Sequence, residues 1–199
     1  MADDETTPDA LAAALQPVLA RILDAGEATT GGGSAAALSG AMAAGLLGMV
    51  ARLSIGKDLE LGDGRYQEVA DEAGQLCAAL AFGAGEDAAA YGLIKAAYAR
   101  PKDTEEEKTA RGAAIHDALI AAAEVPRDNA LACARVLDLC RELVGRSNES
   151  AASDLAVALE LARAGVVGCA GNVDVNVSML EGERAAALLR EADELRERC

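Results

Sequence analysis

Three consecutive glycines followed by a serine are the residues of this chain best suited to bind a ligand. Gly31, Gly32 and Gly33 let a backbone approach a ligand closely, and Ser34 is expected to cap the helix that follows. Free amides at that helix start would favour a carboxylate or phosphate, although glycine-rich turns also serve tight packing alone. The spacing argues against a P-loop ATPase, because Gly32 and Gly33 occupy the Lys and Ser/Thr positions of that motif.

Two aspartates near expected helix starts are the candidates for acid–base chemistry. Asp87 falls in the first turn of one expected helix, and Asp154 follows Ser153 at the start of another. Each carboxylate either takes part in proton transfer or only interacts with the helix dipole, and composition alone favours the dipole. No metal site is expected, because the single histidine, His116, has no ligand partner at helical spacing and the five cysteines form no CxxC pair.

Composition predicts one helical domain with an acidic surface. The 199 residues are 52% hydrophobic, which excludes a disordered tail protein, and the single Phe and three Tyr leave Ala, Leu and Val to fill the core. The net charge of −15 argues against a nucleic acid partner. The odd number of scattered cysteines and the absence of a basic, apolar targeting segment predict a cytoplasmic protein. We expect a flexible segment over residues 1–8 and a helical domain over residues 9–199.

Apolar periodicity, capping signals and helix breakers predict an all-α bundle of about eight helices. Thr104 and Glu107 form a capping box, and Pro126 is expected to start a helix. Residues 172–178 alternate like a strand but have no second strand to pair with, so they are expected to end a helix with Asn172 and Asn176 on one face. The expected helices span about 9–24, 34–55, 65–82 and 86–99, then start near 104, 126, 150 to 153 and 183.

Small residues recur along the helix expected at 34–55. One row consists of Ala36, Gly40, Ala44 and Gly48, and a second row of Ala37, Ala41 and Gly45. Such ridges let other helices approach closely, and one neighbour would not easily cover both, so we expect a homodimer with this helix near the interface. A membrane span is the less favoured interpretation, because Arg52 ends the run and Ala and Gly dominate it.

Five segments in order give the chain a resemblance to a known family. TGGGSAAALSGAMAAGLLGMVARLSIGK is similar to the PGGGS-to-GK segment of the formiminotransferase cyclodeaminase C-terminal domain family, which includes stand-alone bacterial methenyltetrahydrofolate cyclohydrolases. The other four are GEDAAAYGLIKAAYARPKDTEEEKTAR, AAEVPRDNALACARVLDL, SNESAASDLAVALELARAGVVGCAGN and NVDVNVSML. The resemblance covers about residues 10–198 and implies an all-helical fold.

The resemblance also implies a reaction and its residues. It implies a folate one-carbon enzyme that hydrolyses methenyltetrahydrofolate or cyclodeaminates formiminotetrahydrofolate, without a metal or redox cofactor. Asp87 and Asp154 become candidates for a general base or an anchor of the pterin ring. The anionic glutamate tail would require a basic patch. The substrate-binding candidates are Gly31, Gly32, Gly33, Ser34, Lys57, Ser153 and Asn172, and the candidates for the basic patch are Lys57, Arg65, Lys95, Arg100 and Lys102.

Several residues depart from the family pattern. Thr30 replaces a proline, Gly92 an acid, Ala156 a glycine and Asp174 an arginine, and the lysines that usually follow Lys57 are missing. These changes keep a second hypothesis open, that of an inactive helical homodimer acting as a binding or scaffold protein.

Overall fold

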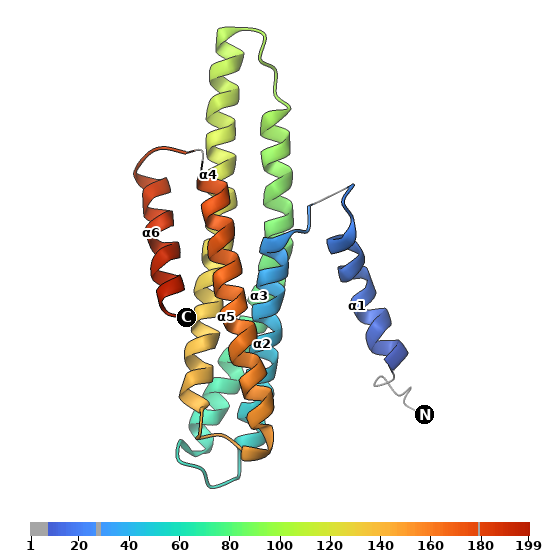
Figure 1. Cartoon of the computed structure of the whole chain (residues 1–199), viewed down its shortest axis with the longest axis vertical. Coiled ribbons are helices and arrows are strands. Elements are labelled where there is room, and N and C mark those ends of the chain that lie inside the picture. Colours follow the sequence, from blue (N-terminus) through green and yellow to red (C-terminus); the bar gives the residue numbers. More distant parts are fainter. Residues whose placement is uncertain (1–7, 27–28, 179) are drawn as a thin grey trace.

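The computed structural model describes residues 8–26, 29–178 and 180–199, and every regular element in these ranges is a helix. The all-α prediction is therefore confirmed, but the predicted number of eight helices is wrong. The described residues form six α-helices and one short 3-10 helix (Figure 1). They are α1 (Pro8–Leu23), α2 (Gly32–Ser54), α3 (Gly62–Tyr98), α4 (Glu105–Leu143), η1 (Glu149–Ala151), α5 (Ala152–Val177) and α6 (Glu183–Glu197). Residues 1–7 of the predicted flexible segment lie outside the described residues.

Two pairs of helices that the sequence predicts as separate are single helices in the structure, α3 and α4. The glycines and the proline expected to separate them lie inside these helices. Gly83 and Gly85 both lie inside α3, and a Cβ at Gly83 would stand 2.0 Å from the Oδ1 atom of Asn129, so this glycine makes room for a neighbouring helix. Pro126 lies inside α4 and is buried there. A glycine in a helix interior costs about 1 kcal/mol relative to alanine, which close packing can offset.

The predicted capping box at the start of α4 is present. The Glu107 amide donates to the Thr104 hydroxyl at 3.1 Å, and the Thr104 amide donates to the Glu107 carboxylate at 3.1 Å. The segment with strand-like alternation is helical up to Val177, as expected.

Helices α2, α3, α4 and α5 pack side by side, and the upper parts of α3 and α4 extend beyond the other two (Figure 1). The small residues of α2 face these neighbours in the same chain. A Cβ at Gly40 would lie 2.3 Å from Cys133 Sγ in α4, and one at Gly48 would lie 3.4 Å from Ala73 in α3. A Cβ at Gly168 in α5 would lie 2.7 Å from the Ala36 Cβ. Three helices of the same chain thus cover the first row, which does not need a second subunit. In the second row Ala37 and Ala41 are buried, whereas Gly45 is exposed.

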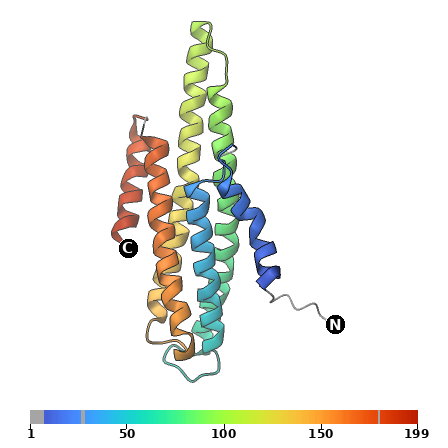
Figure 2. The same cartoon turned by 45° about the vertical axis from the view of Figure 1, so that its right-hand side comes forward.

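A different face of α2 is exposed. Met42, Met49 and Leu53 are 54%, 39% and 46% exposed. Helix α1 stands away from the bundle in both views (Figures 1 and 2), and its apolar stripe is exposed. Two helical segments, Gly32–Ser54 and Glu149–Val177, are long and apolar enough to span a membrane. In their most apolar 18-residue stretches, 61% of the first and 39% of the second are buried in the protein. Core helices of soluble bundles pass the same test, so this is weak evidence for a membrane protein.

Candidate functional site

The glycine-rich segment meets Asp87 where α2 begins. The N-terminal cap of α2 is Gly31 in an extended conformation, and Ser34 lies in the first turn instead of capping the helix as expected. The buried Ser34 hydroxyl donates a 2.8 Å hydrogen bond to Asp87 Oδ2 in α3. Asp87 lies deep within α3, so the prediction of a helix-start acid is wrong. Its carboxylate faces the amino end of a different helix, α2, whose dipole favours a negative charge.

The three glycines have unequal steric roles. A Cβ at Gly33 would lie 2.4 Å from Asp87 Oδ1, a distance that real Cβ contacts essentially never show. A Cβ at Gly32 would lie 3.7 Å from Asn172 Nδ2, in ordinary contact, and one at Gly31 would meet nothing within 4 Å. Only Gly33 must therefore be glycine for the carboxylate to reach its observed position.

A cavity of about 220 Å³ opens at this junction. Asp87, Asn172 and Asn176 supply its charged and amide side chains, and the α2 start supplies backbone amides. Tyr91, Ile94 and Val175 supply apolar surface, and Thr29, Gly31, Gly32, Gly33, Ala90 and Ala122 complete the lining. A cavity that combines apolar side chains with a few converging polar groups is typical of a small-molecule site.

The amide nitrogens of the two asparagines in the lining are hydrogen-bonded to backbone carbonyls. Asn172 Nδ2 donates to the Gly168 carbonyl at 2.9 Å, and Asn176 Nδ2 donates to the Ala122 carbonyl at 2.8 Å. Asn176 and Tyr91 are absent from the residues predicted from the sequence. Two features of the sequence could have identified them. Asn176 shares a helix face with Asn172, and Tyr91 follows Asp87 by one helical turn.

Lys57, Ser153 and Asp154 lie at the other end of the bundle. Ser153 and Asp154 lie in the first turn of α5, close to where Asn148 donates to the Leu53 carbonyl at the end of α2. Helix α2 has 23 residues, which corresponds to about 33 Å at 1.5 Å per residue. One chain therefore does not bring Asp154 together with Asp87, and only Asp87 lies at the start of α2.

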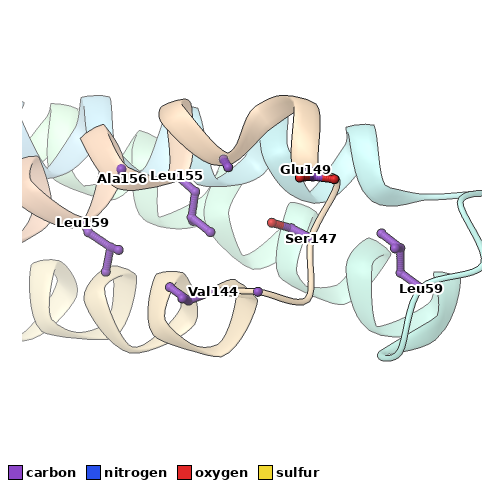
Figure 3. A pocket seen from close by; sticks show the side chains of 9 residues that line it. Leu59, Val144, Ser147, Glu149, Leu155, Ala156 and Leu159 are labelled. Carbon is purple, nitrogen blue, oxygen red and sulfur yellow. The ribbon is translucent and has the colours of Figure 1, made fainter.

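A larger cavity of about 540 Å³ lies at that other end (Figure 3). Leu59, Val144, Leu155 and Leu159 line most of it, and its polar side chains are those of Ser147 and Glu149. Neither Ser153 nor Asp154 is among its lining residues. This cavity has the volume for a ligand but few groups that could orient a polar one.

The predicted basic patch is divided between the two ends. Arg65, near Lys57, is engaged by Glu142 at 2.7 Å and Glu68 at 2.9 Å, and its hydrogen bond lowers the pKa of Glu142. Lys95 lies one turn beyond Tyr91 in α3, on the side of the small cavity. Of the candidate cations, Lys95 is thus near the Asp87 cavity and Lys57 and Arg65 are remote from it.

Two departures from the family pattern lie outside this cavity. Asp174, which reverses a charge, forms an ion pair with Arg196 of α6 and so helps to hold α6 on α5. Gly92 is exposed, and a Cβ there would meet nothing within 4 Å. Neither Gly92 nor Asp174 is among the lining residues of the cavity.

Comparisons with known proteins identify the family of the chain. The family model described as formiminotransferase-cyclodeaminase matches residues 18–194. The chain is 38% identical over 186 residues to a methenyltetrahydrofolate cyclohydrolase of Methylorubrum extorquens, covering 85% of this chain and 86% of the relative. Its fold matches the crystal structure of a formiminotetrahydrofolate cyclodeaminase from Thermotoga maritima with a TM-score of 0.81 and 25% identity, covering 92% of this chain and 88% of the other. The resemblance noted in the sequence is confirmed, and the chain belongs to the formiminotransferase-cyclodeaminase family.

Proposed function

We propose that this chain is a folate-dependent one-carbon enzyme that hydrolyses 5,10-methenyltetrahydrofolate, with Asp87 as the general base. The observation that carries the proposal is the Asp87 carboxylate, oriented by Ser34 and lining a cavity next to the free amides of α2. The cyclohydrolase relative of Methylorubrum extorquens supports hydrolysis, and the cyclodeaminase from Thermotoga maritima makes formiminotetrahydrofolate the second candidate substrate.

The chemistry requires a group that accepts a proton near a cationic carbon. In methenyltetrahydrofolate one carbon bridges two nitrogens and carries a positive charge. Water attacks this carbon, and Asp87 takes a proton from the attacking water. The bond from the carbon to one nitrogen then breaks as the formyl carbonyl forms, that nitrogen takes a proton, and one proton is released to solvent overall. A carboxylate beside the cation also stabilises the charge before attack.

The cavity dimensions favour binding of one part of the substrate. Its volume of about 220 Å³ lies below the roughly 300–1,000 Å³ of sites that enclose a drug-sized ligand. We infer that the bicyclic ring enters the cavity, with Tyr91 against its face, while the rest of the folate extends outward. Lys95 is the nearest candidate partner for the anionic tail.

A spectroscopic assay tests the proposed reaction. The wild-type chain should accelerate the loss of methenyltetrahydrofolate absorbance over the spontaneous rate, and Asp87→Asn should lower this acceleration by about a hundredfold or more. Asp154→Asn is the matched control and should change it little, because Asp154 lies at the far end of α2. Equal losses in both variants would contradict a site built within one chain. Release of ammonia from formiminotetrahydrofolate, without methenyl hydrolysis, would make cyclodeamination the activity.

We also propose that the chain forms a homodimer through the outer faces of α2 and α3. Helix α3 exposes a row of small residues, Gly74, Ala78, Ala81, Gly85 and Ala89, and large apolar side chains flank it, with Phe82 69% exposed. Exposed small residues at this spacing let a second helix pack closely. Light scattering should give the mass of a dimer, and Gly85→Glu should give a monomer, since a side chain at Gly85 meets nothing within its own chain. A monomeric wild type would contradict this interface.

The proposed location is the cytoplasm, and the proposed reaction uses water and proton transfer without a bound cofactor. Cell fractionation tests the location. Full activity after dialysis against a chelator tests the absence of a metal requirement.

A further inference from the structure

We infer that Pro126 positions Asn176 for substrate binding, and that the Asn176 oxygen accepts an N–H from the pyrimidine part of the reduced pterin ring. This inference rests on the proposed function, because it assigns a role to residues of the same cavity. It goes beyond that function in naming a positioning residue and the substrate group that is recognised.

Helix α4 lacks one backbone hydrogen-bond donor in its interior. In an α-helix the carbonyl of residue 122 accepts from the amide of residue 126. Residue 126 is proline and has no N–H, so the Ala122 carbonyl lacks its regular partner in α4. A buried carbonyl without a partner is costly, and Ala122 is only 3% exposed.

Asn176 supplies the missing hydrogen bond from a neighbouring helix. Its Nδ2 atom lies 2.8 Å from the Ala122 carbonyl oxygen and donates to it across the α4–α5 contact. The amide orientation of Asn176 is thereby fixed, because only its nitrogen can donate to a carbonyl. The Asn176 oxygen cannot donate and is free to accept a hydrogen bond from a ligand in the cavity that this residue lines.

The side-chain amide of Asn172, one turn earlier in α5, is oriented in the same way. Its nitrogen donates to the Gly168 carbonyl at 2.9 Å, which leaves its oxygen able to accept a hydrogen bond from a ligand. With the Asp87 carboxylate, the cavity thus has three side chains that accept hydrogen bonds from a ligand. The side chains of Asp87, Asn172 and Asn176 therefore select a ligand surface rich in N–H groups.

The reduced pterin ring has such a surface. Its 2-amino group, the adjacent ring N3–H and the N8–H are donors, whereas the p-aminobenzoyl-glutamate part carries mainly acceptors and negative charge. The acceptor oxygens therefore favour a pose with the pyrimidine part of the ring innermost. In this pose Asn176 is a specificity-determining residue, and Pro126 acts through it.

Calorimetry with two ligands separates this inference from the proposed function. The ligands are 5-formyltetrahydrofolate and its analogue in which a methyl group replaces the 2-amino group. Wild type should bind the parent compound more tightly, by about tenfold, the usual scale for one good hydrogen bond. Asn176→Leu should lose this preference and bind both ligands alike. Asn148→Ala, which changes an asparagine at the far end of α2, should keep it.

Pro126→Ala tests the positioning role. Alanine restores the amide of residue 126, which then competes for the Ala122 carbonyl and frees the Asn176 amide to rotate. Since alanine is the best helix former, this variant is expected to remain folded. It should weaken the parent ligand's affinity and raise KM while leaving kcat nearly unchanged, and in the Asn176→Leu background it should have no further effect.

The possible results of these binding and kinetic experiments distinguish the proposed function, the recognition by Asn176 and the role of Pro126. No binding of either ligand by the wild type would overturn the proposed function and this inference with it. Binding without a preference for the 2-amino group, or a preference that survives in Asn176→Leu, would overturn the recognition by Asn176 while leaving the function intact. Additive effects of Pro126→Ala and Asn176→Leu would overturn the positioning role. Loss of the preference in both single variants, without additivity, is the expected result.

Discussion

Replacing Gly33 by alanine tests how the chain positions its carboxylate. The added Cβ would lie 2.4 Å from Asp87 Oδ1 and 2.8 Å from Asp87 Cγ, whereas ordinary contact begins near 3.4 Å. Asp87 must therefore move by about 1 Å, a misplacement that can cost roughly a hundredfold in rate. Asp87 is half-buried and can move toward the cavity, so the free energy of unfolding should fall by only about 1 kcal/mol, the low end for overpacking.

Gly32→Ala provides the matched control within the same turn. Its Cβ would stay 3.7 Å from the nearest atom outside its own turn, so we expect a much smaller loss of rate. Gly112→Ala, on the exposed surface of α4, controls for the general effect of a helical Gly→Ala change. The assay is the loss of methenyltetrahydrofolate absorbance, corrected for spontaneous hydrolysis, with chemical denaturation of each variant alongside.

Full activity in Gly33→Ala would refute the argument that Asp87 needs this exact position. An equal loss of rate in Gly32→Ala would also refute it, because any added side chain in the glycine-rich turn would then lower the rate. If Gly33→Ala lost activity because it unfolds, its free energy of unfolding would fall far more than that of Gly112→Ala.

Three further predictions concern stability and reactivity. Gly40→Ala should lower the free energy of unfolding by about 1–3 kcal/mol in urea denaturation, because its Cβ would lie 2.3 Å from Cys133 Sγ, and an unchanged midpoint would contradict this packing. The hydrogen bond from Arg65 lowers the pKa of Glu142, and that from Arg135 lowers the pKa of Glu72. These ion pairs stabilise the folded state fully above the ordinary carboxyl pKa, and the stabilisation is lost as the pH falls through the lowered pKa values of the folded state. At pH values below about 4 the Tm of the wild type should therefore decrease, and the Tm of Glu142→Gln should decrease less steeply. Burial raises the pKa of Cys140 to about 12, so a thiol reagent should modify Cys77 and Cys199 before the buried Cys133, Cys140 and Cys169, and early labelling of Cys140 would contradict its burial.

The sequence predicts the fold class well because helical periodicity and capping are local properties. The capping box at Thr104 and the helical end of α5 are examples, since each follows from neighbouring residues. The number of helices was wrong because Gly83 and Pro126 act through other helices. Gly83 accommodates Asn129, and Pro126 frees a carbonyl for Asn176, and neither partner is close in sequence.

The candidate site was predictable only in part, because some of its residues depend on contacts with helices that are distant in the sequence. The glycines, Ser34, Asp87 and Asn172 could be named from motifs, and the structure brings them together. Lys57, Ser153 and Asp154 come from motifs of equal strength but lie at the other end of α2, because the antiparallel course of α2 and α5 separates the start of one from the start of the other. Asn176 was missed as a site residue because its role depends on a hydrogen bond to a distant helix.

A crystal structure of the chain with bound 5-formyltetrahydrofolate tests the central claim most directly. The bicyclic ring should lie between the start of α2, Asp87 and Asn176, with the one-carbon group near the Asp87 carboxylate. A ring bound in the larger cavity beside Leu155, or next to Asp154, would contradict it.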